Sequence, residues 1–349
     1  MSSITVLGAG AMGSALCTPL IDAGWDVRLW GTWLDDHLLD ACEAGKPHPR
    51  TNEPLADGVK LFRSTELDEA LDGADVVVMS VASVGVPKIT EIALPGIVKA
   101  DALWLTSKGF NPDQEGKIQL LPDAIRRIAK EQGYEELPPI VAIAGPVKAN
   151  ECAARKPTAT IFGCKDLEVA KRYARAARTD AYKIEATNDE VGVEICAPMK
   201  NVYAIALGIS DGLEEGTGIP HHNLKAATFT QAVREMSGLG VHLGADTATA
   251  FGLPGVGDLE VTGLSGRNKV YGVRIGRGEK PAEALAEMDR LEQTVEGVPA
   301  ASLAEKLVEQ SGLDIETDLP LLGAVIKILN GTTEPVQQVI AKAVLPRES

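Results

Sequence analysis

The chain has 349 residues, of which 45% are hydrophobic and 24% are charged, so it can form about two globular domains and is neither a disordered chain nor a fibre. Lys and Arg total 34 against 49 for Asp and Glu, which gives a formal charge of −15. This balance argues against nucleic acid as the main partner, because a phosphate backbone requires clustered cations. A small anionic ligand in a locally cationic pocket remains compatible with an acidic surface.

The cysteines and the N-terminus bear on the cellular compartment. The cysteines are odd in number and form no C-x-x-C pair: Cys17, Cys42, Cys152, Cys164 and Cys196. This usage predicts reduced thiols in a cytosol, with neither a disulfide framework nor a metal site. The first residues carry no basic stretch, and their short apolar run leads directly into glycines. We therefore expect a cytoplasmic protein with no signal peptide and no membrane span.

Short apolar runs recur through the first half of the chain. They predict strands over residues 4–7, 26–30, 75–81, 102–106, 140–144 and 159–162, with a helix over 14–23 between the first two. Fully apolar runs of this kind are typical of parallel strands that are covered on both faces. The alternation of strands and helices predicts an α/β domain with a mostly parallel, doubly wound sheet of the Rossmann type.

The pattern changes to helical near residues 186–189. Asn188 or Asp189 is placed to cap a helix that continues beyond Asn201. Later segments read as helices joined by glycine-rich loops, notably 251–258. The prediction is a dinucleotide-binding Rossmann domain over residues 1–187 and an all-α substrate domain over 188–349, with the active site between them.

A glycine turn follows the first predicted strand. Residues 8–13 match G-x-G-x-x-G, in the order Gly8, Ala9, Gly10, Ala11, Met12, Gly13. The first glycine permits a tight turn, the second lets the backbone approach a pyrophosphate, and the third packs helix on strand. The pattern lies between a strand and a helix, which is the context that dinucleotide binding requires.

The end of the second predicted strand bears on the choice between NAD and NADP. An NAD site has an acid there for the ribose 2′-hydroxyl. This strand runs into Trp30, Gly31 and Thr32, whereas Asp35 and Asp36 come a few residues later. Thr32 could donate to a 2′-phosphate. The cofactor stays open between NAD and NADP, with a slight preference for NADP.

Polar residues follow several of the apolar elements. Ser107-Lys108-Gly109 and Gly145-Pro146 each follow a predicted strand, Lys200-Asn201 lies in an otherwise apolar helix, and Asp258, Thr262, Arg267 and Asn268 end a glycine-rich segment. Each has a plain interpretation when taken alone. A lysine at a strand end is usually solvated, and one in an apolar helix such as Lys200 often extends outward to water.

Taken together, these motifs resemble the NAD(P)-dependent glycerol-3-phosphate dehydrogenases. The match runs in order from Ile4 to Gly297 and includes, besides the motifs above, residues 8–16, Trp30-Gly31, Ala149 with Glu151, residues 199–205, 225–227, 257–259, 266–268 and 295–297. The resemblance implies the two-domain fold and the reversible reduction of dihydroxyacetone phosphate to sn-glycerol 3-phosphate, a precursor of glycerophospholipids.

The resemblance also implies roles for individual residues. Lys200 matches the catalytic lysine, Lys108 a lysine at substrate and nicotinamide, and Asp258 an acid near the reacting centre. Further substrate contacts are Gly145, Asn201, Thr262, Gly266, Arg267 and Asn268, the last two holding the phosphate. Cofactor contacts are Gly8, Gly10, Ala11, Met12, Gly13, Thr32, Lys108, Ala149, Arg267 and Glu296.

These roles agree with the chemistry of the side chains. Hydride addition to a ketone develops negative charge on oxygen, which a cation must stabilise and a proton donor must quench. Lys200 can do both, and we expect burial and a second ammonium such as Lys108 to lower its pKa. The planar fork of Arg267 suits a phosphate.

The chain departs from the family pattern at three places. Val147 and Lys148 follow Gly145-Pro146, Pro198 precedes Lys200 in the helix, and residues 82–85 lack the Pro and aromatic residues common in that cofactor loop. The pair His221-His222 is also unusual. Adjacent histidines point to different helix faces, so a shared metal is not expected. Alternative functions are a dehydrogenase of another phosphorylated polyol or ketose, one acting on a β-hydroxy acid, and a non-catalytic NAD(P) sensor. The apolar helical domain leads us to expect a homodimer.

Overall fold

The computed structural model describes residues 2–346. Over these residues the chain forms two compact units, one made of residues up to Asn111 together with Leu120–Val193, and one made of Pro112–Gln119 together with the chain from Glu194 onward. The predicted boundary between residues 187 and 188 falls at the end of a strand shortly before Val193, and it stays a prediction.

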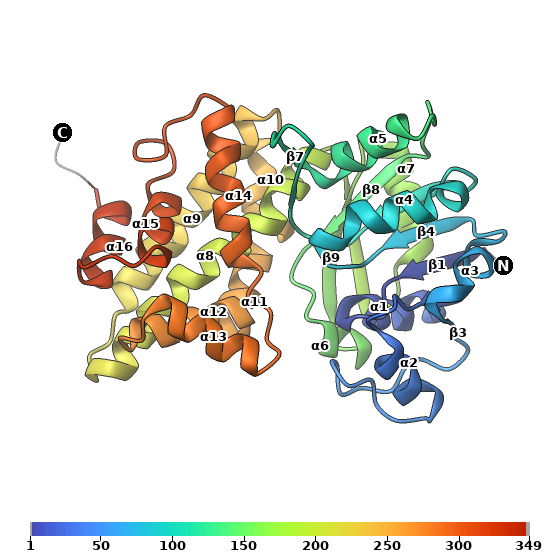
Figure 1. Ribbon diagram of the computed structural model, residues 1–349, viewed down its shortest axis with the longest axis horizontal. Coiled ribbons are helices and arrows are strands. Elements are labelled where there is room, and N and C mark those ends of the chain that lie inside the picture. The colour runs from blue at the N-terminus through green and yellow to red at the C-terminus, as the bar shows by residue number, and fades with distance from the viewer. Residues whose placement is uncertain (1, 347–349) are drawn as a thin grey trace. The chain divides into compact units, whose positions relative to one another are not determined.

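The first unit is built on one large sheet (Figure 1). In spatial order and within the described residues, its strands are β10 (Tyr182–Thr187), β9 (Thr158–Gly163), β8 (Ile140–Ala144), β5 (Ala102–Leu105), β4 (Val76–Met79), β1 (Ser3–Leu7), β2 (Asp26–Trp30) and β3 (Lys60–Phe62). The pairs are parallel except for β8 with β9, which is antiparallel. The predicted doubly wound, mostly parallel sheet is therefore confirmed.

Side chains of successive strand residues enter two separate cores, because strand side chains alternate between the faces of a sheet. Val76 and Val78 pack on one side with α1 (Ala11–Asp22) and α7 (Leu167–Ala177), whereas Val77 and Met79 pack on the other side with α4 (Val86–Ile97). The helices are α1 (Ala11–Asp22), α6 (Ala149–Ala153) and α7 (Leu167–Ala177) on the first face, and α3 (Leu67–Leu71), α4 (Val86–Ile97) and α5 (Leu121–Glu131) on the second. The α2 helix (Asp36–Glu43) follows β2.

The second unit consists mainly of helices. They are the later part of α8 (Glu190–Thr217), then α9 (His222–His242), α10 (Thr247–Phe251), α11 (Asp258–Ser265), α12 (Arg267–Gly276), α13 (Pro281–Arg290), α14 (Gly297–Gln310), α15 (Pro320–Leu329) and α16 (Val336–Val344). As expected, Asp189 caps α8, since its Oδ1 accepts from the N–H of Gly192 at 2.9 Å. The helix runs through Pro198 without a break. None of the described helices is both long and apolar enough to cross a membrane.

A small hairpin was not predicted. It pairs β6 (Phe110–Pro112) with β7 (Ile118–Leu120), and its residues Pro112–Gln119 belong to the second unit although they lie between β5 and α5 in the chain. The amide of Gln310 in α14 binds Ile118 twice, accepting from its N–H at 2.8 Å and donating to its carbonyl at 2.6 Å. This side chain therefore takes the place of a neighbouring strand.

Candidate active site

The glycine turn has the close contacts that its motif predicts. Gly8 has a φ of +107°, and a Cβ there would lie 2.9 Å from Val81 Cγ1. A Cβ on Gly13 would collide with the carbonyl oxygen of Gly8. A Cβ on Gly10 would instead meet nothing within 4 Å. Gly8 and Gly13 are thus required by packing, whereas the bare backbone at Gly10 leaves room for a ligand.

This turn fits the pyrophosphate of a dinucleotide. Gly10 is the N-cap of α1, a helix of 12 residues with no acidic residue in its first turn. The N–H groups of a first helical turn have no partner within the helix, and the helix dipole places positive charge there. Ala11 and Met12 follow in that first turn. The turn can therefore bind an anionic group through backbone donors.

The segment after β2 differs from the expectation for Thr32. The Thr32 hydroxyl donates to Asp35 Oδ2 at 2.9 Å, and the Thr32 N–H donates to the same oxygen at 2.9 Å. Asp35 is buried and also accepts from the Ala9 N–H at 3.3 Å. The hydroxyl proton of Thr32 is thus used within the chain. Asp35 contacts the glycine motif through this bond to Ala9. The sequence did not indicate this contact, because Asp35 comes several residues after the end of the strand.

Three further predicted residues belong to the first unit. Lys108 follows β5, and a Cβ on its neighbour Gly109 would lie 2.6 Å from Ser83 Oγ in the segment after β4. Gly145 follows β8 with a φ of +139°, and its Cβ position is 3.0 Å from Thr160 Cα. Ala149 is the first residue of α6. Each of the three therefore follows the carboxyl end of a strand, where ligands of such sheets bind.

Lys200, Asp258 and Thr262 form a buried cluster in the second unit. The Lys200 ammonium donates to Asp258 Oδ1 at 2.8 Å and to Thr262 Oγ1 at 2.6 Å. Lys200 is 7% exposed, Asp258 1% and Thr262 8%. The plain interpretation, in which Lys200 extends outward to water, is therefore wrong. A buried ammonium with a carboxylate and a hydroxyl is held in one position, because leaving such a charge unpaired is costly.

Local backbone structure places Asp258. The glycine-rich segment before it forms a single π-helical turn, η3 (Leu253–Gly257), and Asp258 then begins α11. A Cβ on Gly255 would collide with the carbonyl of Ala250, so only glycine fits this turn. Turns of this type often occur at functional sites. Thr262 lies one helical turn after Asp258 on α11, which directs both side chains to Lys200.

A second network contains Asn268, one of the two residues predicted to hold the phosphate. Asn268 Nδ2 donates to Asn201 Oδ1 at 3.0 Å, and Asn268 Oδ1 accepts from the Gly297 N–H at 2.8 Å. Asn201 Nδ2 in turn donates to Glu296 Oε2 at 3.1 Å. Asn268 and Asn201 are buried. These bonds fix the start of α14 against α8 and the start of α12.

Arg267 lies beside this network with a freer side chain. It is the first residue of α12, after the N-cap Gly266, and its side chain is 49% exposed. Its Nη2 is 3.6 Å from Glu296 Oε1. A half-exposed guanidinium at the N-terminus of a 10-residue helix can bind an oxyanion together with the backbone N–H groups of that helix.

Glycines hold α8 and α12 in register. A Cβ on Gly208 of α8 would collide with the Lys269 carbonyl, and a Cβ on Gly272 of α12 would collide with the Ile205 carbonyl. The two helices therefore touch through their backbones. Since α8 carries Lys200 and α12 begins at Arg267, this contact sets the position of the lysine relative to the arginine.

A buried carboxylate supports the other side of α8. Glu235 of α9 accepts from the Tyr203 hydroxyl at 2.8 Å and from the N–H groups of Leu321 and Leu322 at 2.6 and 3.0 Å. Gln231 donates to it at 2.9 Å. Burial raises the pKa of Glu235 above its usual value, although these donors partly oppose the shift. The network joins α8, α9 and the start of α15.

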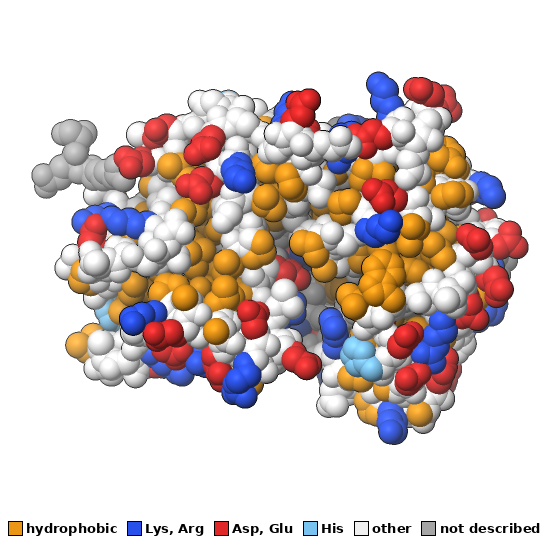
Figure 2. Space-filling model, viewed as in Figure 1, with side chains coloured by type: hydrophobic (Ala, Val, Ile, Leu, Met, Phe, Trp, Pro, Cys, Tyr) orange, Lys and Arg blue, Asp and Glu red, His pale blue; other side chains and the backbone are white. Residues whose placement is uncertain are grey.

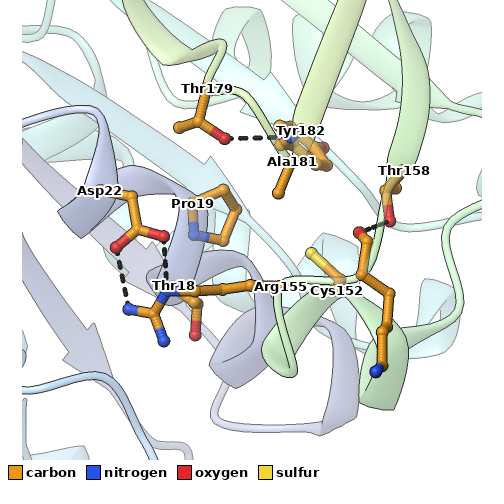
Figure 3. A pocket seen from close by; sticks show the side chains of 10 residues that line it. Thr18, Pro19, Asp22, Cys152, Arg155, Thr158, Thr179, Ala181 and Tyr182 are labelled. Carbon is orange, nitrogen blue, oxygen red and sulfur yellow. Dashed lines mark hydrogen bonds and ion pairs between the residues drawn. The ribbon is translucent and has the colours of Figure 1, made fainter.

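A small cavity elsewhere in the first unit is not part of this site (Figure 3). Its volume is about 10 Å³, room for a single water, and it lies beside the ion pair of Arg155 with Asp22. The two nitrogens of Arg155 donate to the two oxygens of Asp22 at 2.7 and 2.8 Å. The pair connects α1 with the turn after α6, which gives this region a structural role.

On the face that Figure 2 shows, acidic and basic side chains are interspersed. Among residues 2–346, no group of three or more His, Cys, Asp or Glu side chains is placed to hold a metal ion. His222 is exposed, with Nδ1 3.9 Å from Glu214 Oε2, and His221 is the N-cap of α9.

Comparisons with known proteins identify one family. A family model described as NAD-dependent glycerol-3-phosphate dehydrogenase N-terminus matches residues 3–170, and the corresponding C-terminus model matches residues 189–340. An NADP(+)-dependent glycerol-3-phosphate dehydrogenase from Archaeoglobus fulgidus is 36% identical over 327 residues, which is 93% of this chain and 94% of that protein. A glycerol-3-phosphate dehydrogenase [NAD(P)+] from Geobacillus kaustophilus is 34% identical, over 97% of this chain and 93% of that protein.

Solved structures lead to the same family. The crystal structure of glycerol-3-phosphate dehydrogenase from Coxiella burnetii is similar with a TM-score of 0.83, at 27% identity and with 98% of each chain covered. The two family models together span most of the sequence. The chain belongs to the NAD-dependent glycerol-3-phosphate dehydrogenase family.

Proposed function

We propose that this protein is an NAD(P)-dependent glycerol-3-phosphate dehydrogenase that interconverts dihydroxyacetone phosphate and sn-glycerol 3-phosphate. The proposal rests on the buried ammonium of Lys200, which Asp258 and Thr262 hold in place. Lys200 lies on α8, and glycines pack this helix closely against α12, which begins at Arg267. A dehydrogenase needs such a proton donor, whereas a protein that only senses nucleotides does not. The product is a precursor of glycerophospholipids.

Lys200 acts on the oxygen of the substrate. When bound, the nicotinamide cofactor supplies the hydride equivalent that adds to the carbonyl carbon. Lys200 stabilises the negative charge that develops on oxygen and transfers one proton to it, so that the ketone becomes an alcohol. Asp258 and Thr262 hold the lysine Nζ during this transfer, and in the reverse direction the amine of Lys200 accepts the proton.

The phosphate of the substrate is assigned to the start of α12. Arg267 provides the guanidinium, and the first N–H groups of the helix after Gly266 provide backbone donors. Asn268 keeps one hydrogen of its amide for the phosphate, since its Oδ1 and other hydrogen bind within the protein. Asn201 positions Asn268.

The remaining roles follow the family motifs. Lys108 and Gly145 are assigned to the substrate, with Lys108 also at the nicotinamide. Gly8, Gly10, Ala11, Met12, Gly13, Ala149, Arg267 and Glu296 are assigned to the cofactor. The open backbone at Gly10 and the uncapped first turn of α1 support the cofactor part of this assignment.

NADP is the proposed preference. The acid nearest the end of β2 is Asp35, whose carboxylate already accepts from Thr32 and Ala9 and is buried. It is therefore poorly placed to accept the ribose 2′-hydroxyl that an NAD site binds. The relative from Archaeoglobus fulgidus, named as NADP(+)-dependent, supports the same preference.

The test is to mix the purified protein with dihydroxyacetone phosphate and either NADPH or NADH, and to follow the loss of nicotinamide absorbance. We expect oxidation that requires the phosphorylated ketose and is faster with NADPH. Turnover only with a longer phosphorylated ketose or a β-hydroxy acid would change the substrate assignment. Tight NADPH binding without any turnover would favour a sensor.

We further propose that the protein is a cytoplasmic homodimer. The five cysteines, all within the described residues, form no disulfide bond, which suits a reducing compartment. Exposed apolar side chains of the second unit, among them Ile219, Phe251 and Leu264, are available for contact between copies. Light scattering on the purified protein should give twice the chain mass of 36.8 kDa, and a mass equal to one chain would contradict the dimer. Cell fractionation tests the location.

A further inference from the structure

A buried histidine lies against the glycine turn and has no part in the proposed reaction. His48, in the segment between α2 and β3, is 1% exposed. Its Nε2 is 2.9 Å from the carbonyl oxygen of Ala9, the second residue of the glycine motif. His48 belongs to none of the sequence motifs, and nothing in the local pattern around it indicates a contact with residue 9.

The two hydrogen bonds of the ring determine its protonation. The N–H of Arg50 donates to Nδ1 at 3.2 Å, and a backbone N–H can only donate. Nδ1 therefore carries a lone pair. The carbonyl of Ala9 can only accept, so Nε2 carries the hydrogen. His48 is the neutral Nε2–H tautomer, and burial lowers its pKa below the usual value.

The backbone around His48 holds the ring in place. The His48 N–H donates to the Glu53 carbonyl at 2.9 Å, and the His48 carbonyl accepts from Asn52 at 2.8 Å and from Thr51 at 3.2 Å. Asn52 has a φ of +58°, the left-handed conformation that closes this turn. Because both its backbone and its ring are held by hydrogen bonds, His48 can fix the orientation of the backbone group that its ring contacts.

The neighbour in question is the peptide between Ala9 and Gly10. Asp35 accepts the N–H of Ala9, and His48 donates to the carbonyl of Ala9. In a trans peptide the N–H of Gly10 points opposite to that carbonyl. Fixing the carbonyl with His48 therefore fixes the direction of the Gly10 N–H, at the position where a Cβ would meet nothing within 4 Å.

We propose that His48 is a positioning residue for the dinucleotide: its neutral imidazole orients the Ala9–Gly10 peptide so that the Gly10 N–H binds the pyrophosphate, and protonation of the ring releases this peptide. The inference rests on the proposed function, because it takes the ligand of the turn to be a dinucleotide. His48 itself touches neither the cofactor nor the substrate. Its effect is on the affinity of both NADPH and NADH, since they share the pyrophosphate.

The release on protonation follows from the donors that surround the ring. A proton on Nδ1 would face the Arg50 N–H, and two donors would then oppose each other across 3.2 Å. The charged and titratable groups that act on the ring are Asp35, which favours the charged form, and Arg50 and His37, which oppose it. Cofactor affinity should therefore fall as the pH drops through the pKa of His48.

The experiment measures NADPH and NADH affinity by calorimetry without any ketose. His48→Gln places an amide N–H near the position of Nε2 and keeps the bond to Ala9, whereas His48→Asn places an amide oxygen near Nδ1 and loses it. We expect His48→Asn to weaken both cofactors about tenfold, which corresponds to the loss of one buried hydrogen bond, and His48→Gln to stay near wild type. The kcat at saturating cofactor should be unchanged in both.

The matched control is His242, whose Nε2 binds the Ser311 carbonyl at 2.9 Å in the second unit. His242→Asn should leave cofactor affinity unchanged. Because burial lowers the pKa of His48, wild-type affinity should weaken as the pH falls below the ordinary histidine value of 6.5, and that of His48→Gln should change less over the same range. Equal affinity of wild type and His48→Asn would overturn the inference, as would equal pH profiles of wild type and His48→Gln.

Failure of this inference can be told apart from failure of the proposed function. A protein that binds NADPH but does not reduce dihydroxyacetone phosphate would contradict the reaction and still allow the His48 variants to be compared. A wild-type protein that binds neither cofactor would overturn both. Thermal unfolding of each variant without cofactor shows whether a lower affinity reflects loss of fold.

Discussion

The ammonium of Lys200 and the carboxylate of Asp258 form an ion pair at 2.8 Å although they are 58 positions apart in the chain. Both side chains are almost completely buried. An ion pair in such a place contributes little net stability, because desolvation of both charges offsets their attraction. Its value lies in holding the lysine Nζ at one point, which is what a proton donor requires.

Replacing Lys200 with Met should separate catalysis from folding. We expect kcat to fall by about 10²–10⁴-fold, the usual contribution of a general acid. The variant should also unfold more easily, by about 3–5 kcal/mol, because the buried Asp258 loses the ammonium that balances its charge. Steady-state kinetics and thermal unfolding measure the two effects.

The double variant Lys200→Met, Asp258→Asn is the control for that separation. It removes both charges and should recover most of the lost stability, but none of the lost turnover. NADPH affinity should be close to wild type in both variants, because the glycine turn belongs to the first unit. Full turnover by Lys200→Met would remove the lysine from the mechanism.

Arg267→Ala should act on the phosphate of the substrate. Loss of a charge-assisted pair should raise KM for dihydroxyacetone phosphate by roughly 10–100-fold, while activity toward unphosphorylated dihydroxyacetone stays as low as in wild type. Arg290, which is exposed and pairs with Glu287, offers a matched control. If Arg290→Ala raised KM as much as Arg267→Ala, the effect would be one of general surface charge.

Two glycine variants should give opposite results. Gly13→Ala places a Cβ against the Gly8 carbonyl and should destabilise the first unit by about 1–3 kcal/mol. Gly10→Ala meets open space in the free protein, and its backbone conformation suits alanine, so its melting temperature should not change. Its NADPH affinity should nevertheless fall by roughly tenfold or more. Normal NADPH binding by Gly10→Ala would show that the pyrophosphate lies elsewhere.

Glu235 should make stability depend on pH. Its pKa is raised in the folded protein, so the folded state keeps the proton at pH values where the unfolded chain has lost it. The stabilisation is therefore full below the ordinary pKa of 4.5 and decreases as the pH rises through the folded-state value. Glu235→Gln should remove this slope. Denaturant unfolding of both proteins at a series of pH values measures the difference, and parallel curves would argue against the shift.

The buried strands of the first unit could be predicted because their apolar runs are unbroken. The runs at β2 and β8 have the bounds that the sequence suggests. The missed strands are β3 and β10 at the two edges of the sheet, and the hairpin strands β6 and β7. In β10 the exposed, charged Lys183 and Glu185 alternate with apolar residues, and β3 has only three residues, so neither resembles a buried strand.

The site could be predicted only in part. The motifs identify Lys200, Asp258 and Thr262, but their contact depends on η3 and on the packing of α8 with α12, which short sequence patterns do not encode. The role of Thr32 at the cofactor stays a prediction, and its hydrogen bond to Asp35 could not be read from the local sequence pattern. The hydrogen bond between His48 and Ala9 joins residues 39 positions apart in the chain, and no sequence pattern predicts it.

The second unit is not a continuous stretch of chain. It includes Pro112–Gln119, where Gln310 forms two hydrogen bonds with Ile118. Its longer segment begins at Glu194, which lies within α8. A chimaera that joins the first half of one relative to the second half of another must therefore transfer two segments together. Exchange of a single C-terminal block would leave Gln310 facing a foreign hairpin and would place the junction within a helix.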